Sequence, residues 1–358
     1  MSMSKIASRG LFHKPSRRVR VSGLAIAVSA GLLVSGCAQS GDTSSTDPAA
    51  DSSDNACDIS STYPSGAIEF IVPWAAGGGT DSVSRFVGIQ LSDRLGVPVN
   101  VVNRDGGGGV IGHTAIANGK ADGSLIGMTT VEITMMHWQG LTDLSYEDIT
   151  PIAQVNSDPS GITVAADAPW DTIEELLDDA RANPGEIVGS GTAIGGIWDL
   201  ARAGMLLEAG MDVNDIRWVP SAGSAPALQE LAAGGIDVTF ASLAENATMI
   251  GAGEARPLAI MGEERDPNYP DVPTLKEVGI DFSMGSWRGV SGPSGMDEDI
   301  VAELACQVDD IVQSDEYIEF MTTAGFGVDG KDTDAFTEFI VNEDEAKGTI
   351  MEAAGLTG

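Results

Sequence analysis

Residues 70–81 carry the feature that most constrains the fold: a short apolar segment, then a glycine loop, then an amphipathic pattern. The apolar segment ends at Pro73, and the loop that follows holds Gly77, Gly78 and Gly79. Beyond Asp81 the apolar side chains recur at helical spacing. The stretch therefore predicts a strand, a tight turn and a helix N-terminus, where unpaired N–H groups and the helix dipole favour an anion. The alternative is a strand-to-helix turn that binds nothing.

The same alternation of apolar and amphipathic segments continues along the chain. The predicted strands are 67–72, 98–102, 125–129, 151–155, 161–165, 186–190, 217–220, 236–240 and 257–261. The predicted helices are 81–95, 111–118, 172–183, 198–209, 225–233, 297–313, 315–323 and 332–354. This order favours parallel sheets flanked by helices. Small or hydroxylated residues follow three strands of the middle section, at the ends where open α/β sheets bind ligands: Thr192, Ser221, Ser224 and Ser242.

The first 37 residues resemble an export signal. They contain no acidic residue, carry six basic ones, and then run through an apolar segment, 21–34, that is short for a membrane span of about 20 residues. The segment ends in V-S-G-C, which resembles the lipobox of bacterial lipoproteins and would make Cys37 the lipidated first residue. An ordinary signal peptide with an incidental cysteine is the alternative. Residues 38–62 are rich in small polar residues and predict a flexible tether.

The charge excludes one class of partner. All 53 acidic residues lie beyond residue 37, whereas only about 13 of the 19 basic ones do, so the rest of the chain has a net charge of about −40. Nothing in it could neutralise phosphates, and nucleic acid is excluded as a partner.

The cysteines suggest one disulfide. If Cys37 is lipidated, Cys57 and Cys306 remain, and two cysteines in an exported chain favour a bond between them. Two free buried thiols are the alternative.

The sequence offers little support for catalysis. Residues 107–112 fit G-x-G-x-x-G, but three residues separate the preceding strand from the glycines and the next helix is short, so we reject a dinucleotide site. There is no P-loop and no G-x-S-x-G elbow. His113 and His137 have no nucleophile paired with them in sequence, and we expect both to be structural or surface residues. No Cys or His spacing suggests zinc. We therefore expect no enzyme, no cofactor and no metal.

Five ordered motifs carry a family resemblance. Residues 72–81, V-P-W-A-A-G-G-G-T-D, resemble V-P-[FW]-[AP]-x-G-G-x-[ST]-D, and residues 103–109 resemble N-x-x-G-A-G-G. Residues 121–125 resemble P-D-G-Y-T, and 220–228 and 269–275 also match. These are marks of the solute receptors of tripartite tricarboxylate transporters, also called the Bug family, and the resemblance covers 63–354.

The resemblance implies a type II periplasmic-binding-protein fold, with two doubly wound α/β domains, a hinge and a ligand cleft. Domain I would hold 63–160 and 285–358, and domain II 161–284. A monomeric receptor would catch a small carboxylated solute outside the cell membrane and hand it to the membrane components of a secondary transporter. A receptor that docks on a sensor kinase is an alternative, and an exported enzyme is a third interpretation.

The family grips carboxylates with two loops, which correspond here to 74–81 and 190–196. The implied ligand-binding residues are Trp74, Ala75, Gly78, Gly79, Thr80, Asp81, Thr130, Glu132, Thr192, Ala193, Ile194, Asp199, Ser221, Ser224 and Ser242.

Three positions depart from the family pattern. Glu132 follows the third strand where Ser, Thr or Gly is usual, Trp198-Asp199 replaces Ser-His or Pro-His, and Ala241 stands where an acidic residue is frequent. Acidic side chains near the cleft suggest a solute that has an amino group, fewer carboxylates or one uncharged end. The alternative is that Glu132 and Asp199 point to solvent. Asp81 either caps its helix or selects such a solute.

Overall fold

The computed structural model describes residue 57 and residues 62–358. The predicted export signal, its Cys37 and the tether up to residue 61 lie outside the described residues, apart from Cys57. We use the predicted boundaries as names: lobe I is 63–160 with 285–358, and lobe II is 161–284. In the part of the chain that the structure describes, no helix is both long enough and apolar enough to cross a membrane.

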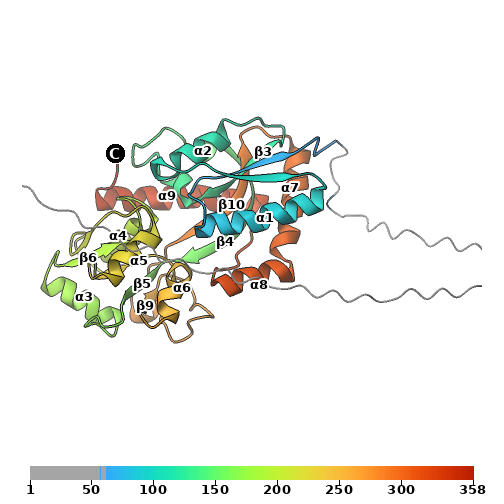
Figure 1. Ribbon diagram of the computed structural model, residues 1–358. Helices are drawn as coiled ribbons and strands as arrows, with labels where there is room; N and C mark the ends of the chain where they lie inside the picture. The colour runs from blue at the N-terminus through green and yellow to red at the C-terminus, as the bar shows by residue number, and fades with distance from the viewer. Residues whose placement is uncertain (1–56, 58–61) are drawn as a thin grey trace, which may run out of the picture. The chain divides into compact units, whose positions relative to one another are not determined.

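Lobe I is built on a sheet of five strands in the order β2-β1-β3-β10-β4 (Figure 1). The strands are β1 (Ile68–Val72), β2 (Val99–Asn103), β3 (Leu125–Thr130), β4 (Ile149–Pro159) and β10 (Gly285–Pro293). β1 is parallel to β2 and β3, whereas β10 runs antiparallel to β3 and β4. β1, β3 and β10 are almost wholly buried, as their continuous apolar and small residues require.

The helices of lobe I come from both ends of the described chain. They are α1 (Gly79–Leu95), α2 (Val110–Ala117), α7 (Glu298–Val312), α8 (Asp315–Ala324) and α9 (Thr333–Ala354). Short 3₁₀ turns lie at Gly107–Gly109, Val131–Thr134 and Tyr146–Asp148. α1 and α7 pack beside each other, and α9 packs against β4 and against a helix of lobe II, α4 (Ile197–Glu208). α7 also packs against β4, and α8 packs against α7, so the last three helices lie with the first sheet.

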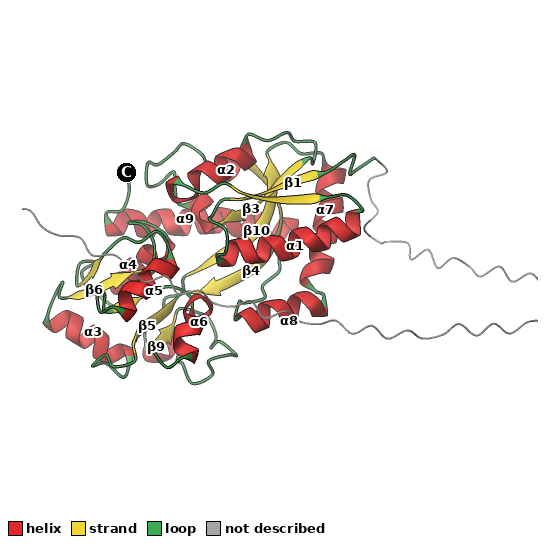
Figure 2. Ribbon diagram, viewed as in Figure 1, coloured by secondary structure: helices red, strands yellow, loops and turns green. Residues whose placement is uncertain are grey.

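Lobe II has its own five-stranded sheet, in the order β7-β6-β8-β5-β9, with helices around it (Figure 2). Its strands are β5 (Gly161–Ala165), β6 (Ile187–Ser190), β7 (Ile216–Trp218), β8 (Val238–Thr239) and β9 (Ala255–Ile260). Its other helices are α3 (Ile173–Ala182), α5 (Ser224–Ala232) and α6 (Leu243–Gly251), and a 3₁₀ turn lies at Lys276–Val278.

Both sheets are mixed, and this corrects the expectation of parallel sheets. β6 is parallel to β7 and β8, but β5 runs antiparallel to β8 and β9. The reversed strands, β5 and β10, are those that directly follow a crossing between the lobes. Neighbouring parallel strands are joined by a crossover connection, usually a helix. A strand that enters a sheet from the other lobe has no such connection, so it can run antiparallel to its neighbours.

Two adjacent strands carry the chain between the lobes. β4 ends at Pro159 and β5 begins at Gly161, and the returning β10 begins at Gly285, directly opposite Pro159. A side chain on Gly285 would lie 2.5 Å from the carbonyl oxygen of Asp158, so only glycine allows this approach. Ser160 donates a hydrogen bond from its hydroxyl to the carbonyl of Phe240 at 2.6 Å, which fixes the crossing to lobe II.

Cys57 and Cys306 form a disulfide, with their Cα atoms 5.4 Å apart. Cys306 lies on α7, so the bond fastens the start of the described chain to lobe I. It spans 249 residues of sequence, and such long loops are where a cross-link restricts the unfolded chain most.

Candidate functional site

The first glycine turn joins β1 to α1. Gly77 has a φ of +87°, a conformation that favours glycine, and its N–H donates to Asp81 Oδ2 at 2.8 Å. Gly78 is the N-cap of α1 with an extended backbone, and Asp81 is the third residue of the helix. The turn is therefore held by a carboxylate that reaches back from the first helical turn to the residue before the cap.

The second glycine turn, between β6 and α4, has the same construction. Gly195 has a φ of +70° and donates its N–H to Asp199 Oδ2 at 2.9 Å. Gly196 is the extended N-cap, and Asp199 is the third residue of α4.

The two turns share one sequence, A-x-G-G-x-x-D, at 75–81 and 193–199. In each, the aspartate also binds an arginine further along the helix. Arg85 Nη2 lies 2.9 Å from Asp81 Oδ1, and Arg202 Nη2 lies 2.6 Å from Asp199 Oδ1. The sequence contains this repeat, but the two loops were predicted as separate motifs. The matching aspartate contacts identify them as one construction.

This construction leaves the helix N-termini available to an anion. The first N–H groups of a helix have no intrahelical acceptor, and they carry the positive end of the helix dipole. Ala75 and Ala193 are exposed, as is Gly78, and Ile194 keeps 61% of its surface accessible. Both turns can therefore present N–H groups to a small anion.

Asp81 and Asp199 are occupied by these internal contacts. Asp81 also accepts from Asn103 Nδ2 at 2.8 Å. Burial acts to raise the Asp81 pKa, but the hydrogen bonds from Arg85, Gly77 and Asn103 hold that pKa below its ordinary value. Asp199 is 1% exposed and accepts from two nitrogens of Arg202. The contacts therefore favour positioning of the turns over selection of a solute, and Asp199 does not point to solvent.

Glu132 lies at the end of a hydrogen-bond chain in lobe I. Trp74 Nε1 donates to Thr130 Oγ1 at 3.1 Å, and that hydroxyl donates to Glu132 Oε2 at 2.6 Å. Glu132 is 9% exposed, and burial raises the pKa of its carboxyl against the lowering effects of Thr130 and Arg288. The structure thus brings together three of the predicted residues, and Glu132 is buried instead of solvated.

His113 holds the backbone of Thr130, the middle residue of this hydrogen-bond chain. It is fully buried, its Nδ1 donates to the carbonyl of Gly109 at 2.8 Å, and its Nε2 accepts the N–H of Thr130 at 3.1 Å. This arrangement requires the neutral ring, and burial lowers the pKa of His113 to about 4.

Acid should therefore weaken the fold through His113. In the unfolded chain the ring has a pKa of 6.5, whereas in the folded chain its pKa is about 4. Between these two values the unfolded chain binds more protons, so the free energy of unfolding falls as the pH decreases from 6.5 to about 4. Between pH 7 and pH 5 we expect this residue to account for a loss of roughly 2 kcal/mol in the free energy of unfolding. Urea unfolding of the wild type and of His113→Gln at both pH values measures it. Equal pH dependence in the two proteins would contradict the assignment.

Lobe II contains a matching chain that ends at Glu245. Trp198 Nε1 donates to Ser224 Oγ at 3.1 Å, and Ser224 Oγ donates to Glu245 Oε2 at 2.8 Å. Glu245 is the third residue of α6, and Ser242 caps this helix by accepting from the Glu245 N–H. Neither α6 nor Glu245 was predicted from the sequence. The pattern S-x-x-E at 242–245 after a strand is a capping-box signal that could have found them.

The remaining predicted residues lie around the second turn. Ser221 donates its N–H to the carbonyl of Thr192 at 2.9 Å, so the loop after β7 is tied to the loop after β6. The Thr192 hydroxyl is buried and has no hydrogen-bond partner among the described residues. Gln139 of lobe I donates from Nε2 to the carbonyl of Gly195 at 2.6 Å, which links the second turn to lobe I.

Arg288 on β10 is a further residue at the site, and the sequence patterns did not predict it. Its Nε donates to Thr80 Oγ1 at 3.0 Å, and its Nη1 donates to Asp158 Oδ2 at 2.6 Å. Phe326 lies against the guanidinium, whose carbon is 5.4 Å from the ring centroid. A side chain on Gly79 would lie 2.9 Å from Phe326, so this glycine allows the close approach of the turn to the arginine.

The rejected motifs have structural roles. In the 107–112 segment, Gly108 and Gly109 have positive φ, and a side chain on Gly112 would lie 2.3 Å from Pro73. These glycines therefore serve turns and close packing. His137 lies 3.2 Å from Asp344 in an ion-pair geometry. Within residues 57 and 62–358 no group of three metal-ligating side chains is present.

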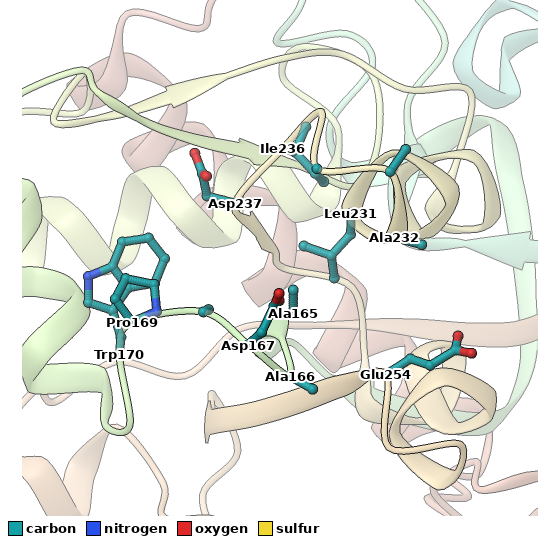
Figure 3. A pocket seen from close by; sticks show the side chains of 13 residues that line it. Ala165, Ala166, Asp167, Pro169, Trp170, Leu231, Ala232, Ile236, Asp237 and Glu254 are labelled. Atoms are coloured by element: carbon teal, nitrogen blue, oxygen red, sulfur yellow. The ribbon is translucent and has the colours of Figure 1, made fainter.

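A hollow of about 730 Å³ lies elsewhere in lobe II (Figure 3). It is lined by the segment after β5, by Leu231 and Ile236, and by Asp237 and Glu254. Asp237 precedes β8, and β6, which leads into the second glycine turn, runs parallel to β8, so the hollow and that turn lie at opposite ends of these strands. It is not part of the candidate site.

Comparisons with known proteins agree with this geometry. Residues 83–356 match a family described as "Tripartite tricarboxylate transporter family receptor". The protein BugT of Bordetella pertussis is 30% identical over 296 residues, which cover 81% of this chain and 87% of BugT.

Solved structures show the same similarity. A TctC solute-binding protein from Polaromonas, determined without ligand, is 34% identical with a TM-score of 0.69, over 82% of this chain and all of the other. An R. palustris protein determined with adipate is 26% identical with a TM-score of 0.73, over 82% of this chain and 99% of the other. The expected two-domain α/β fold and the family resemblance are confirmed.

Proposed function

This chain belongs to the tripartite tricarboxylate transporter receptor family, and we propose that its two glycine turns grip one small carboxylated solute. Members of the family are extracytoplasmic solute-binding receptors. The observation that carries the proposal is the repeated A-x-G-G-x-x-D turn, which places a helix N-terminus at the end of a strand in each lobe. A relative determined with adipate supports a carboxylate as the bound group.

Local contacts, and not the overall charge, must provide the attraction. The chain carries a formal net charge of −34, which repels an anion at long range. That field is screened beyond about 8–10 Å at physiological ionic strength. A few charge-assisted hydrogen bonds, at about 1.5–3 kcal/mol each, can outweigh the remaining repulsion at contact distance.

The wider assignment follows from the family and from the first residues of the sequence. We infer export by the segment 1–37 and a lipid anchor at Cys37 on the outer face of the cell membrane. The loaded receptor would act as a monomer and pass its solute to the membrane components of a secondary transporter. Docking on a sensor kinase is the second candidate. We do not assign an enzyme activity, since the family and the fold are those of solute-binding receptors.

Solute binding can be tested on the purified chain. Native mass spectrometry detects a retained solute, and thermal unfolding with adipate, citrate and other carboxylic acids should show at least one stabilising ligand. Thr192→Val removes the unpaired hydroxyl of the second turn and should weaken that ligand by about fivefold to tenfold.

Ser291→Ala is the matched control, because it also removes a buried hydroxyl without a partner, but inside β10. It should leave the affinity unchanged. A chain that binds no carboxylic acid, or that turns its ligand over into a product, would contradict the proposal.

A further inference from the structure

One guanidinium nitrogen of Arg288, Nη2, has no hydrogen-bond acceptor among the described residues, whereas Nε and Nη1 bind Thr80, Asn156 and Asp158. The side chain is only 6% exposed. Nη2 lies 3.1 Å from the position that a side chain on Gly79 would occupy, so it points at the first turn of α1. A free donor on a nearly buried side chain, facing a helix N-terminus, has the geometry to bind a carboxylate together with the helix N–H groups.

Glu132 and Glu245 are not paired with a cation among the described residues. Each accepts a hydrogen bond from a hydroxyl that is itself held by a tryptophan, so each carboxylate is fixed in place as an acceptor. Within the described residues, no lysine, arginine or histidine forms a salt bridge with either glutamate. Among the described residues, Asp158 is the one acidic partner within salt-bridge distance of Arg288, at 2.6 Å. The site therefore has two carboxylates more than its arginine can balance.

The two glutamates belong to one site. Arg288 is the common neighbour. It lies opposite Thr130, the hydrogen-bond partner of Glu132, in the pairing of β10 with β3. Its guanidinium lies over Phe326, and a side chain on the preceding Gly325 would lie 3.5 Å from Ala244, the neighbour of Glu245. Burial raises the pKa of both glutamates, the charge of Arg288 lowers it in both, and Glu245 raises that of Glu132 further. The three charged groups are thus within electrostatic reach across the lobes.

A cation between the glutamates would relieve this imbalance. An unpaired charge in a partly buried site is costly, and a bound ammonium group offers both a compensating charge and three donors. A solute with carboxylates alone would instead meet two further acceptors and gain nothing from them.

We propose that the solute is a zwitterion, whose ammonium group lies between Glu132 and Glu245 while its carboxylate meets Arg288 and the first turn of α1. This inference rests on the proposed receptor function and names its class of substrate. The sequence also suggested a solute with an amino group. Glu132 and Glu245 are now its proposed partners, whereas Asp81 and Asp199 are occupied by contacts within the turns.

Matched ligand pairs test the proposal on the intact chain. Isothermal titration calorimetry with L-glutamate against glutarate, L-aspartate against succinate and L-alanine against propionate varies the amino group alone. For the pair that binds, we expect the aminated member to bind at least tenfold more tightly, as one or two charge-assisted hydrogen bonds imply.

Neutral variants separate recognition from folding. In Glu132→Gln and Glu245→Gln the aminated ligand should lose at least tenfold in affinity, whereas its deaminated partner should bind as well as before or better. A merely structural role would weaken both ligands in parallel. Glu208→Gln, at the C-terminal end of α4, is the control and should change neither affinity.

The outcomes distinguish the two proposals. If the deaminated member binds as tightly or more tightly, the zwitterion inference falls and the carboxylate receptor stands. If no member of any pair binds and no carboxylic acid stabilises the chain, the receptor proposal falls and takes the inference with it.

Discussion

Replacing Arg288 by methionine should lower the free energy of unfolding by about 3–5 kcal/mol, because it leaves Asp158 as an uncompensated buried charge. Asp158 is 2% exposed, and within the described part of the chain its other carboxylate oxygen accepts from the Gly327 N–H alone, so water cannot replace the guanidinium without opening the structure. The same change removes the hydrogen bond to Thr80 at the start of α1. Urea unfolding followed by circular dichroism measures the loss.

Two further variants test the cause. Arg104→Met breaks an ion pair with Glu69, in which the two side chains are 45% and 36% exposed, and should cost less than about 1 kcal/mol. The double change Arg288→Met with Asp158→Asn removes the unpaired charge and should recover a clear part of the stability. A single variant as stable as wild type, or a double variant no better than the single, would contradict the explanation.

The sequence patterns predicted those strands and helices whose limits are determined by contacts close in sequence. The strand, turn and helix at 68–95 and the last three helices were predicted within a few residues, because apolar spacing, glycine and capping residues mark them. Helix α6 was missed, although its cap Ser242 and the Glu245 three residues further on mark its start.

Long-range partners were beyond the reach of such patterns. The direction of β5 and β10 depends on how the chain crosses between the lobes, and no residue within either strand encodes it. Arg288 finds its partners across 130 to 208 residues of sequence, so its role at the site is visible only in the fold. Glu132 was noticed as a departure from the family pattern, but its burial beside Thr130 required the structure.

The second large effect is expected at Asp199. Asp199→Ala removes both the acceptor for the Gly195 N–H and the charge that balances Arg202, a side chain that is 6% exposed. Arg202 would keep the carbonyls of Val213 and Ile216 and its contact with Trp218, but no carboxylate. We expect a loss of about 3–5 kcal/mol in the free energy of unfolding, measured in urea.

Asp81→Ala is the natural comparison, because Asp81 occupies the same position in the first A-x-G-G-x-x-D turn. Its arginine, Arg85, is 47% exposed and can turn to water, so the stability loss should be much smaller. Equal losses in the free energy of unfolding for the two variants would show that burial of the arginine does not determine the cost of removing the aspartate.

Solute affinity should not follow this difference in stability. Both variants remove the carboxylate that tethers a glycine N–H and fixes the turn before a helix N-terminus, so both should weaken the bound solute, by about tenfold for one lost preorganising contact. Calorimetric titration at a temperature where both variants remain folded makes the comparison. If the two turns act as one clamp, the variants lose affinity together although they differ in stability; if only Asp199→Ala loses affinity, the first turn does not hold the solute.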